Sequence, residues 1–257
     1  MTFPPSPPPV PAVVSRFANG REVRAVWVNE DGGVTFRLGS AVPGAAGREF
    51  IKVANTGSTD FTDFTGETRR LRWAGAYVTV PRVLGCGIAD DCAWLRTAAL
   101  PGRSAVHPRW LATPDVAVRA IGAGLRTLHD RLPVPSCPFD WSVTSRLTML
   151  SAAGRARLGE PPPVDRLVVC HGDACAPNTL VDDDGRNCGH VDFGQLGVAD
   201  RWADLAVATL SLGWNYPGRD WEAEFFNAYG VQPDPARIDY YRRLWQAFDH
   251  TSDAASR

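Results

Sequence analysis

The sequence predicts an α+β fold of two lobes, with an N-terminal antiparallel sheet plus one helix and a mainly helical C-terminal lobe. Two observations support this prediction. Runs of apolar and β-branched residues separated by turn signals fill the first part of the chain, and helical patterns with capping signals dominate the second part. The chain has 257 residues, of which 44% are hydrophobic, so it is long enough to bury a sizeable core.

The first lobe is expected to span residues 1–97. Residues 1–14 are rich in proline and lack the charged start, long apolar stretch and cleavage site of a secretion signal, so they are expected to form a disordered or extended leader. One helix is expected at about residues 62–73. Strands are expected at residues 23–28, 34–38, 49–53, 82–86 and 92–97.

The second lobe is expected to span residues 98–257 and to begin with a connector of small residues at 98–102. Its first helix, at 113–131, starts with a capping threonine, a proline in the first turn and an acid beside the positive end of the helix dipole. A single helix is expected between residues 143 and 158. Later elements are a strand–loop–strand region at 167–192 and helices near 204–212, 221–229 and 235–248.

Composition excludes several classes of protein. The formal net charge is −1, whereas a nucleic-acid-binding protein normally carries a basic surplus. No apolar run is long enough to span a bilayer, and no feature indicates an obligatory protein partner. The six cysteines show no framework spacing, which favours free thiols in a reducing cytoplasm. Cys170, Cys175 and Cys188 lack the short paired spacing of a zinc site.

Lysine usage singles out one residue. Of the 27 basic residues, 26 are arginine, and Lys52 is the one lysine. A lysine is a compact point charge on a slim stem, so it suits contact with a phosphate group better than an arginine does. Chance survival of one lysine codon is the alternative explanation of this observation alone.

The residues that carry chemistry follow the strand at 167–170. Asp173 lies in His171-Gly172-Asp173, Asn178 comes five residues later, and Asp192 comes fourteen after that in an Asp-Phe-Gly sequence. Protein kinases space their catalytic aspartate, metal-binding asparagine and Asp-Phe-Gly aspartate in this way. A hairpin with strands 179–181 and 189–191, turning at 183–185, would place Asn178 and Asp192 at the same end.

This spacing fits the chemistry of phosphoryl transfer. A carboxylate at Asp173 can orient a hydroxyl group and accept its proton, and Asn178 and Asp192 offer the hard oxygen ligands that Mg²⁺ prefers. Each motif alone is weak, because His-Gly-Asp occurs in metallophosphatases too. Lys52 on the third strand and Glu67 on the following helix stand where a kinase places its phosphate-binding lysine and the ion-pair partner of that lysine. For Glu67 the alternative is a solvated helix face.

These motifs make the chain similar to the aminoglycoside O-phosphotransferases, above all the 3′ and 3″ types. The resemblance covers about residues 23–248 and is strongest over 168–206. It is carried by residues 170–178 (CHGDACAPN), 190–194 (HVDFG) and 197–206 (GVADRWADLA), with weaker similarity at 80–83, 128–129 and 137–140.

The resemblance implies a two-lobed protein-kinase-like fold, ATP or GTP as phosphate donor, Mg²⁺, and a polycationic antibiotic as acceptor. It implies that residues 1–97 form the nucleotide-binding lobe, that Ala98 to Leu100 form a hinge beside the adenine, and that Asp204 braces the catalytic loop. The roles it implies for the remaining residues are a catalytic base at Asp173, metal ligands at Asn178 and Asp192, a phosphate contact at Lys52 and an ion-pair partner at Glu67.

Four segments depart from the family pattern, all on the nucleotide or acceptor side. They are a loop at 29–33 without the usual serine, Gln195 where 3′ relatives often have arginine, a short stretch at 140–167, and a tail at 245–249 without an acidic pair. Asp140 and Asp249 are the best candidates for carboxylates that bind the acceptor, and a solvated surface position is the alternative for both. Trp214, Tyr216 and Trp221 either line the acceptor site or belong to the core.

The sequence leaves three other functions open. The first is a kinase of the same fold that phosphorylates another small alcohol, such as a sugar, an amino alcohol or a different antibiotic. The second is a nucleotide-binding protein without catalysis, which the presence of base, metal ligands and lysine disfavours. The third is a metallophosphoesterase built on His171 and Asp173, which would need more metal-spaced histidines and aspartates than the sequence has.

Overall fold

The computed structural model describes residues 8–29, 32–57 and 64–249, with only the backbone described at Asp249. The chain divides into two compact units, Met1–Gly102 and Arg103–Arg257. The division falls after the connector rather than before it. The connector belongs to the first unit because the Ala98 N–H donates to the Arg82 carbonyl at 2.9 Å and the Ala99 N–H donates to the Arg48 carbonyl at 3.0 Å.

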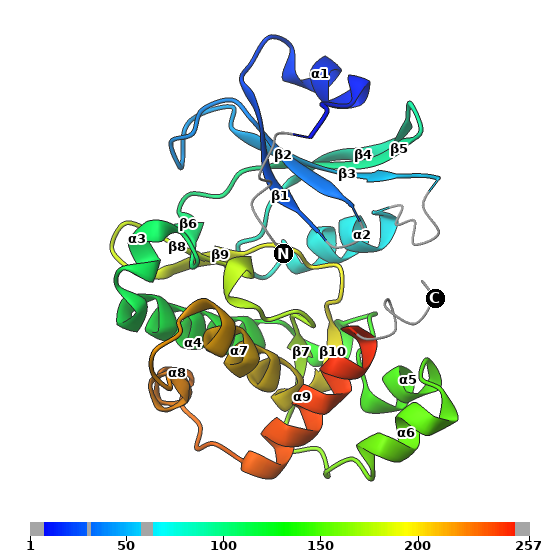
Figure 1. Ribbon diagram of the computed structural model, residues 1–257, viewed down its shortest axis with the longest axis vertical. Coiled ribbons are helices and arrows are strands. Elements are labelled where there is room, and N and C mark those ends of the chain that lie inside the picture. The colour runs from blue at the N-terminus through cyan, green and yellow to red at the C-terminus, as the bar shows by residue number, and fades with distance from the viewer. Residues whose placement is uncertain (1–7, 30–31, 58–63, 250–257) are drawn as a thin grey trace. The chain divides into compact units, whose positions relative to one another are not determined.

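The first unit contains a five-stranded antiparallel sheet in the order β1-β2-β3-β5-β4 (Figure 1). All five expected strands are confirmed, although β3 and β4 run further than expected. Helix α2 (Thr65–Ala74) follows β3 and confirms the expected helix within the described residues. The strands are β1 (Val23–Val28), β2 (Val34–Leu38), β3 (Glu49–Asn55), β4 (Val83–Ala89) and β5 (Cys92–Ala98).

The end of the proline-rich leader corrects the prediction of a disordered or extended segment over residues 1–14. Residues 12–14 begin helix α1 (Ala12–Ala18), in which Val13 and Val14 are buried. Both valines pack with Phe36, Ile51 and other residues of the sheet. The sheet has an apolar face that must be covered. Burial of Val13 and Val14 against this face outweighs the weak helix propensity of the proline-rich leader.

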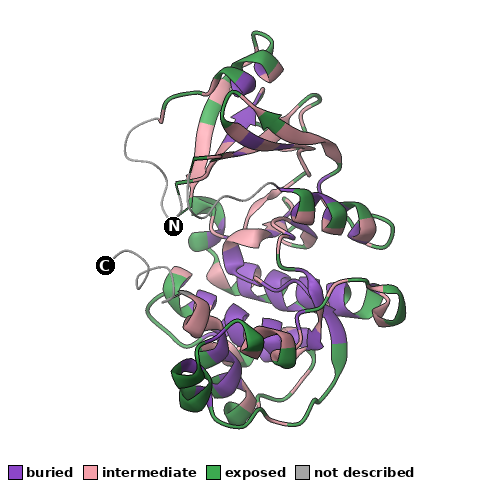
Figure 2. Cartoon of the chain, turned by 90° about the vertical axis from the view of Figure 1, so that its right-hand side faces the viewer, coloured by how far each residue is buried: buried purple, intermediate pink, exposed green. Residues whose placement is uncertain are grey.

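The second unit is mainly helical, as expected, and Figure 2 shows that most of its helices carry buried residues. Thr113 precedes the longest helix but does not cap it, because its hydroxyl donates to the Arg109 carbonyl at 3.1 Å. The helices are α3 (Pro108–Leu111), α4 (Pro114–Arg131), α5 (Val143–Thr148), α6 (Ala152–Leu158), α7 (Trp202–Asn215), α8 (Glu222–Tyr229) and α9 (Pro235–Asp249), with 3₁₀ turns η1 (Val134–Ser136) and η2 (Ala176–Asn178).

The single helix expected between residues 143 and 158 is wrong, since the chain forms α5 and α6 there. Ser151 starts the second of these helices by accepting a hydrogen bond from the Gly154 N–H at 3.1 Å. An N-terminal serine cap of this kind satisfies a backbone donor that an uninterrupted helix would pair with its preceding turn. The helix signal in the sequence is continuous, but the cap breaks it.

Short strands complete the second unit. The strands are β6 (Arg103–Ser104), β7 (Leu167–Cys170), β8 (Thr179–Val181), β9 (Asn187–His190) and β10 (Gly197–Asp200). They form a two-stranded sheet, β10-β7, and a three-stranded sheet, β6-β8-β9.

The three aromatic residues considered for the acceptor site differ in exposure. Tyr216 and Trp221 are buried, whereas Trp214 is 55% exposed. Among the described residues, none of the helices combines the length and apolar character that a membrane crossing requires.

Candidate active site

Lys52 and Glu67 form an ion pair inside the first unit. Strand β3 lies between β2 and β5, and this central position fixes Lys52 opposite Thr35 and Leu95. The Lys52 ammonium donates to both carboxylate oxygens of Glu67, at 2.8 and 3.0 Å. Glu67 is only 8% exposed, so it does not belong to a solvated helix face. The pair that the sequence predicts is therefore present, and it holds the one lysine of the chain in a defined position.

Asp173 lies on the loop that follows β7 in the second unit. Its Oδ2 accepts a hydrogen bond from the Asn178 amide nitrogen at 2.9 Å, and the same nitrogen donates to the Asp173 carbonyl at 3.0 Å. Its Oδ1 is buried and accepts from no nitrogen or oxygen donor of the described residues. A buried carboxylate oxygen without such a donor is costly unless a ligand supplies one. Oδ1 is therefore suited to receive the proton of a substrate hydroxyl.

The electrostatics of Asp173 also suit a base. Burial raises the pKa of its carboxyl group, and the nearby charge of Asp192 raises it further. Hydrogen bonds from the Cys175 thiol and Asn178 oppose this rise without cancelling it. A carboxyl group whose pKa is raised by burial and by a neighbouring carboxylate is typical of sites that bind a cation or move a proton.

The hairpin of β8 and β9 places Asn178 and Asp192 together, as the sequence predicts. Thr179 pairs with His190, and the Val191 N–H donates to the Asn178 carbonyl at 2.9 Å. The residue after Val191 is Asp192, which has a φ of 65°. This left-handed backbone is uncommon for a residue other than glycine, and it occurs where the surrounding structure enforces it.

These side chains fit a magnesium ion by their chemistry. Asp192 contributes a carboxylate, and Asn178 uses its amide nitrogen on Asp173, which leaves the amide oxygen as the group able to bind a cation. One or two protein oxygens, completed by phosphate oxygens and water, are the usual ligand set of Mg²⁺. A cation held by Asp192 would reduce the unfavourable effect of the Asp192 charge on Asp173.

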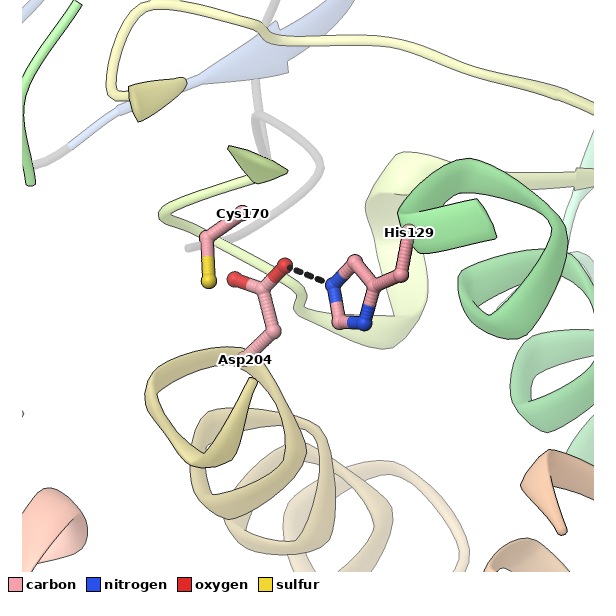
Figure 3. Close-up of side chains that lie close together, drawn as sticks. All are labelled: His129, Cys170 and Asp204. Carbon is pink, nitrogen blue, oxygen red and sulfur yellow. Dashed lines mark hydrogen bonds and ion pairs between the residues drawn. The ribbon is translucent and has the colours of Figure 1, made fainter. Parts of the chain in front are cut away.

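Asp204, at the start of α7, braces the loop that carries Asp173 (residues 171–175), which is the candidate catalytic loop. It is fully buried, and its two oxygens accept hydrogen bonds from the His171 N–H at 2.6 Å and the Gly172 N–H at 2.9 Å. The ring of His129, on α4, lies against the same carboxylate with Nε2 at 2.9 Å (Figure 3). The Tyr229 hydroxyl bonds the other ring nitrogen of His129 at 2.8 Å. Three elements thus fix the two residues that precede Asp173.

Cys170 lies beside His129 and Asp204, and the ligand atoms of these three residues are close enough to hold a metal ion (Figure 3). Burial raises the pKa of the Cys170 thiol well above its usual value, and the Asp204 carboxylate raises it further. The thiol donates to the Asp200 carbonyl at 3.4 Å. A protonated thiol and a carboxylate already engaged by backbone donors make a poor metal site. This cluster is therefore structural, and all six cysteines are free thiols.

Gly172 has no room for a side chain, and this gives a testable prediction. Its φ is +83°, and an added Cβ would overlap the Gln195 carbonyl oxygen and lie 2.7 Å from the Gln195 Cβ. Gly172→Ala is expected to lower the free energy of unfolding by at least about 2 kcal/mol, measured by urea denaturation. Gly213→Ala in α7 is the control, because nothing lies within 4 Å of that position and a helical alanine is favoured by about 0.5–1 kcal/mol.

The remaining predicted site residues have more limited support. Asp140 accepts from the Ser142 N–H at 2.9 Å and from its hydroxyl at 3.1 Å, so both oxygens support the loop before α5. Burial acts to raise the pKa of Asp140, but the hydrogen bonds from Ser142 lower it overall. The side chain of Asp249 lies outside the described residues. The contacts of Ala98 and Leu100 with an adenine base stay a prediction.

The sequence does not predict two hydrogen bonds that support the segments around Asp173 and Asp192. The Ala176 N–H donates to the Ser211 hydroxyl at 2.8 Å, which fixes the turn before Asn178. Arg146 donates to the Gln195 side chain at 2.6 Å. Each bond joins residues more than thirty positions apart, and no motif or periodicity in a single sequence reports such pairs.

A unit with an antiparallel sheet and a Lys–Glu pair, followed by a helical unit with an Asp–Asn–Asp set on a loop and hairpin, defines a kinase-like phosphotransferase. A sequence model described as the phosphotransferase enzyme family matches residues 13–159 and 152–241. The chain belongs to this family.

Characterised members of the family are similar over most of the chain. An aminoglycoside 3′-phosphotransferase of Streptomyces fradiae is 33% identical over 72% of this chain and 80% of its own length. A streptomycin 3″-kinase of Streptomyces griseus is 31% identical over 89% of this chain and 93% of its own length. The structure resembles aminoglycoside phosphotransferase APH(3″)-Id of Streptomyces rimosus in complex with ADP and streptomycin, with a TM-score of 0.65, 25% identity, and coverage of 85% of this chain and 93% of that one.

Proposed function

We propose that this protein transfers the γ-phosphate of ATP to a hydroxyl group of an aminoglycoside, with Mg²⁺ as the cofactor. The observation that carries the proposal is the half-buried set of Asp173, Asn178 and Asp192, in which one Asp173 oxygen is held by Asn178 and the other, itself buried, lacks a nitrogen or oxygen donor among the described residues. Relatives named for aminoglycoside phosphorylation support the choice of acceptor, and the relative solved with ADP supports the nucleotide.

In this proposal Asp173 aligns the acceptor hydroxyl and accepts its proton as the oxygen attacks the γ-phosphorus, while the bond from that phosphorus to the bridging oxygen breaks and ADP leaves. Catalysis of this kind depends on position and charge, because the transferring group is only loosely bonded in the transition state. Mg²⁺, when bound, neutralises phosphate charge. Asn178 and Asp192 would hold it, and Lys52, oriented by Glu67, would contact the nucleotide phosphates.

Three candidate acceptor-binding carboxylates of the second unit are already engaged in the described structure, so they give no basis for a choice between the 3′ and 3″ hydroxyls. Asp140 is engaged by Ser142, Glu222 is paired with Arg242, and Glu224 is paired with Arg219. The extent of the alignment does not separate the two acceptors either, because the streptomycin kinase aligns with 89% of the chain and a 3′-phosphotransferase of Escherichia coli aligns with 93%.

A coupled assay of nucleotide consumption tests the proposal. The purified protein is incubated with ATP or GTP, Mg²⁺, and separately streptomycin, kanamycin, choline or a simple sugar. An aminoglycoside should stimulate turnover, and mass spectrometry should show that it has gained one phosphoryl group. NMR of the product then identifies the phosphorylated hydroxyl. If choline or the sugar is phosphorylated and no aminoglycoside is, the acceptor is another small alcohol and the aminoglycoside proposal is wrong.

Lys52 gives a second test of the nucleotide site. Lys52→Arg is expected to raise the KM for ATP about tenfold, the equivalent of one charge-assisted hydrogen bond, because the guanidinium is bulkier than the ammonium. Arg24→Lys, an exposed position on β1, is the control and should leave the KM unchanged. Because Lys52 is the one lysine, an acyl-phosphate derivative of ATP should acylate it alone among the side chains. If Lys52→Arg shows the wild-type nucleotide kinetics, the proposed contact of Lys52 with the nucleotide phosphates is wrong.

A further inference from the structure

The turn that carries Asp192 connects β9 to β10 and needs support. Asp192 adopts a left-handed backbone conformation, with a φ of 65°, which is unfavourable for a residue other than glycine. Such a conformation persists only when neighbouring contacts over-determine it. The contacts of Phe193, Gln195 and Leu196, which follow Asp192 in the same turn, therefore help to fix the position of its carboxylate.

Two of the supports are apolar and buried. Phe193 is fully buried, and its ring centroid lies 4.8 Å from that of His171. Leu196 is fully buried as well, and its N–H donates to the Phe193 carbonyl at 3.2 Å. These contacts hold the side of the turn that faces the core. Gln195 lies between Phe193 and Leu196 in the sequence, and its polar side chain holds the outer side of the turn.

Gln195 contacts both the loop that carries Asp173 and Arg146. Its backbone packs against Gly172, the residue before Asp173, so closely that no Cβ fits there. Its side-chain oxygen accepts a hydrogen bond from Arg146 at 2.6 Å, a short charge-assisted bond. Gln195 thus connects the catalytic loop, the Asp192 turn and Arg146.

Arg146 is itself held in place. It lies on α5, whose first turn is capped by the Ser142 hydroxyl through the Ser145 N–H at 3.2 Å. Its guanidinium lies over the ring of Trp141, 4.3 Å from the centroid, and 5.2 Å from the centroid of Phe248 on α9. A planar guanidinium stacked on aromatic rings presents its donors in a fixed direction.

We propose that Arg146 is a positioning residue, which fixes the metal-binding turn by holding Gln195 from α5. The inference rests on the proposed function, since it takes Asp192 as a magnesium ligand. Outer residues that orient a metal ligand typically change metal affinity 10- to 100-fold when they are replaced. Arg146 acts on the ligand through Gln195 and the backbone, so a change at the lower end of this range is expected.

Calorimetric titration of ADP, without an acceptor, tests the proposal in the full-length protein. In Arg146→Ala, ADP binding in excess Mg²⁺ is expected to weaken about tenfold, and ADP binding in EDTA is expected to stay unchanged. Gln195→Leu should reproduce this effect, and the double variant should be no weaker than either single one. Gln195→Glu should retain the wild-type affinity, because a carboxylate also accepts from Arg146. Arg119→Ala, which removes an exposed arginine on α4, is the control.

The contrary outcomes are distinct. If Arg146→Ala weakens ADP binding equally with Mg²⁺ and with EDTA, the residue is merely structural and the proposal fails. If both ADP affinities stay at the wild-type values and only the KM of the acceptor changes, Arg146 belongs to the acceptor site and the proposal also fails. If the wild-type protein binds ADP no better with Mg²⁺ than with EDTA, the proposed function itself is wrong.

Discussion

Asp173→Asn is expected to lower kcat for the stimulating acceptor by on the order of 10²- to 10⁴-fold, with the KM for ATP close to the wild-type value. An amide keeps the shape of the side chain but cannot accept the hydroxyl proton, and general base catalysis typically contributes this factor. Steady-state kinetics with the acceptor identified by the panel measures the change. Asp184→Asn is the control, because that side chain is 75% exposed at the hairpin turn, and it should retain full activity.

The same variant should not be less stable than the wild-type protein. Burial and the charge of Asp192 raise the pKa of Asp173, so the ionised form is unfavourable in the folded state. Replacement by a neutral amide removes that cost, and catalytic residues are often placed at such a cost to stability. Urea denaturation in EDTA measures the free energy of unfolding of the variant and of the wild type.

The kinetic measurement can contradict the assignment of the base. If Asp173→Asn is fully active, the base is another residue.

Much of the site could be predicted because its signals are local. Asp173, Asn178 and Asp192 lie within twenty residues of one another, and the hairpin between the last two is marked by its turn residues. The position of Lys52 was predictable because strand order follows chain order up to β3. The contact of Lys52 with Glu67 then depends on the helix that directly follows that strand.

The unpredicted parts depend on contacts between distant residues. Helix α1 forms because Val13 and Val14 cover a sheet built from later strands, and a proline-rich composition gives no sign of this. The break between α5 and α6 depends on one serine cap in a sequence that otherwise favours helix. The bond from Arg146 to Gln195 spans 49 residues. A single sequence does not record which side chains meet after folding.

Asp204→Asn is expected to lower the free energy of unfolding by about 3–5 kcal/mol at neutral pH. The carboxylate accepts two backbone N–H bonds and lies 2.9 Å from a ring nitrogen of His129, and removing one partner of a buried charged group typically costs this much. Urea denaturation followed by tryptophan fluorescence measures it. Asp239→Asn, which breaks an exposed pair with Arg243 on α9, is the control and should cost less than about 1 kcal/mol.

The pH dependence of the same variant separates charge from packing. Burial acts to raise the pKa of Asp204, but the hydrogen bond and charge of His129, with the charge of His171 and the Gly172 N–H, lower it overall. A carboxyl group with a lowered pKa stabilises the fold above its unfolded pKa and loses that contribution as the pH falls through its folded pKa. The difference in unfolding free energy between the wild type and Asp204→Asn should therefore be constant at neutral pH and shrink below about pH 4. Should Asp204→Asn not fold, His129→Gln keeps both backbone bonds and should cost about 1–3 kcal/mol. A loss below 1 kcal/mol in both variants would show that the catalytic loop does not depend on Asp204.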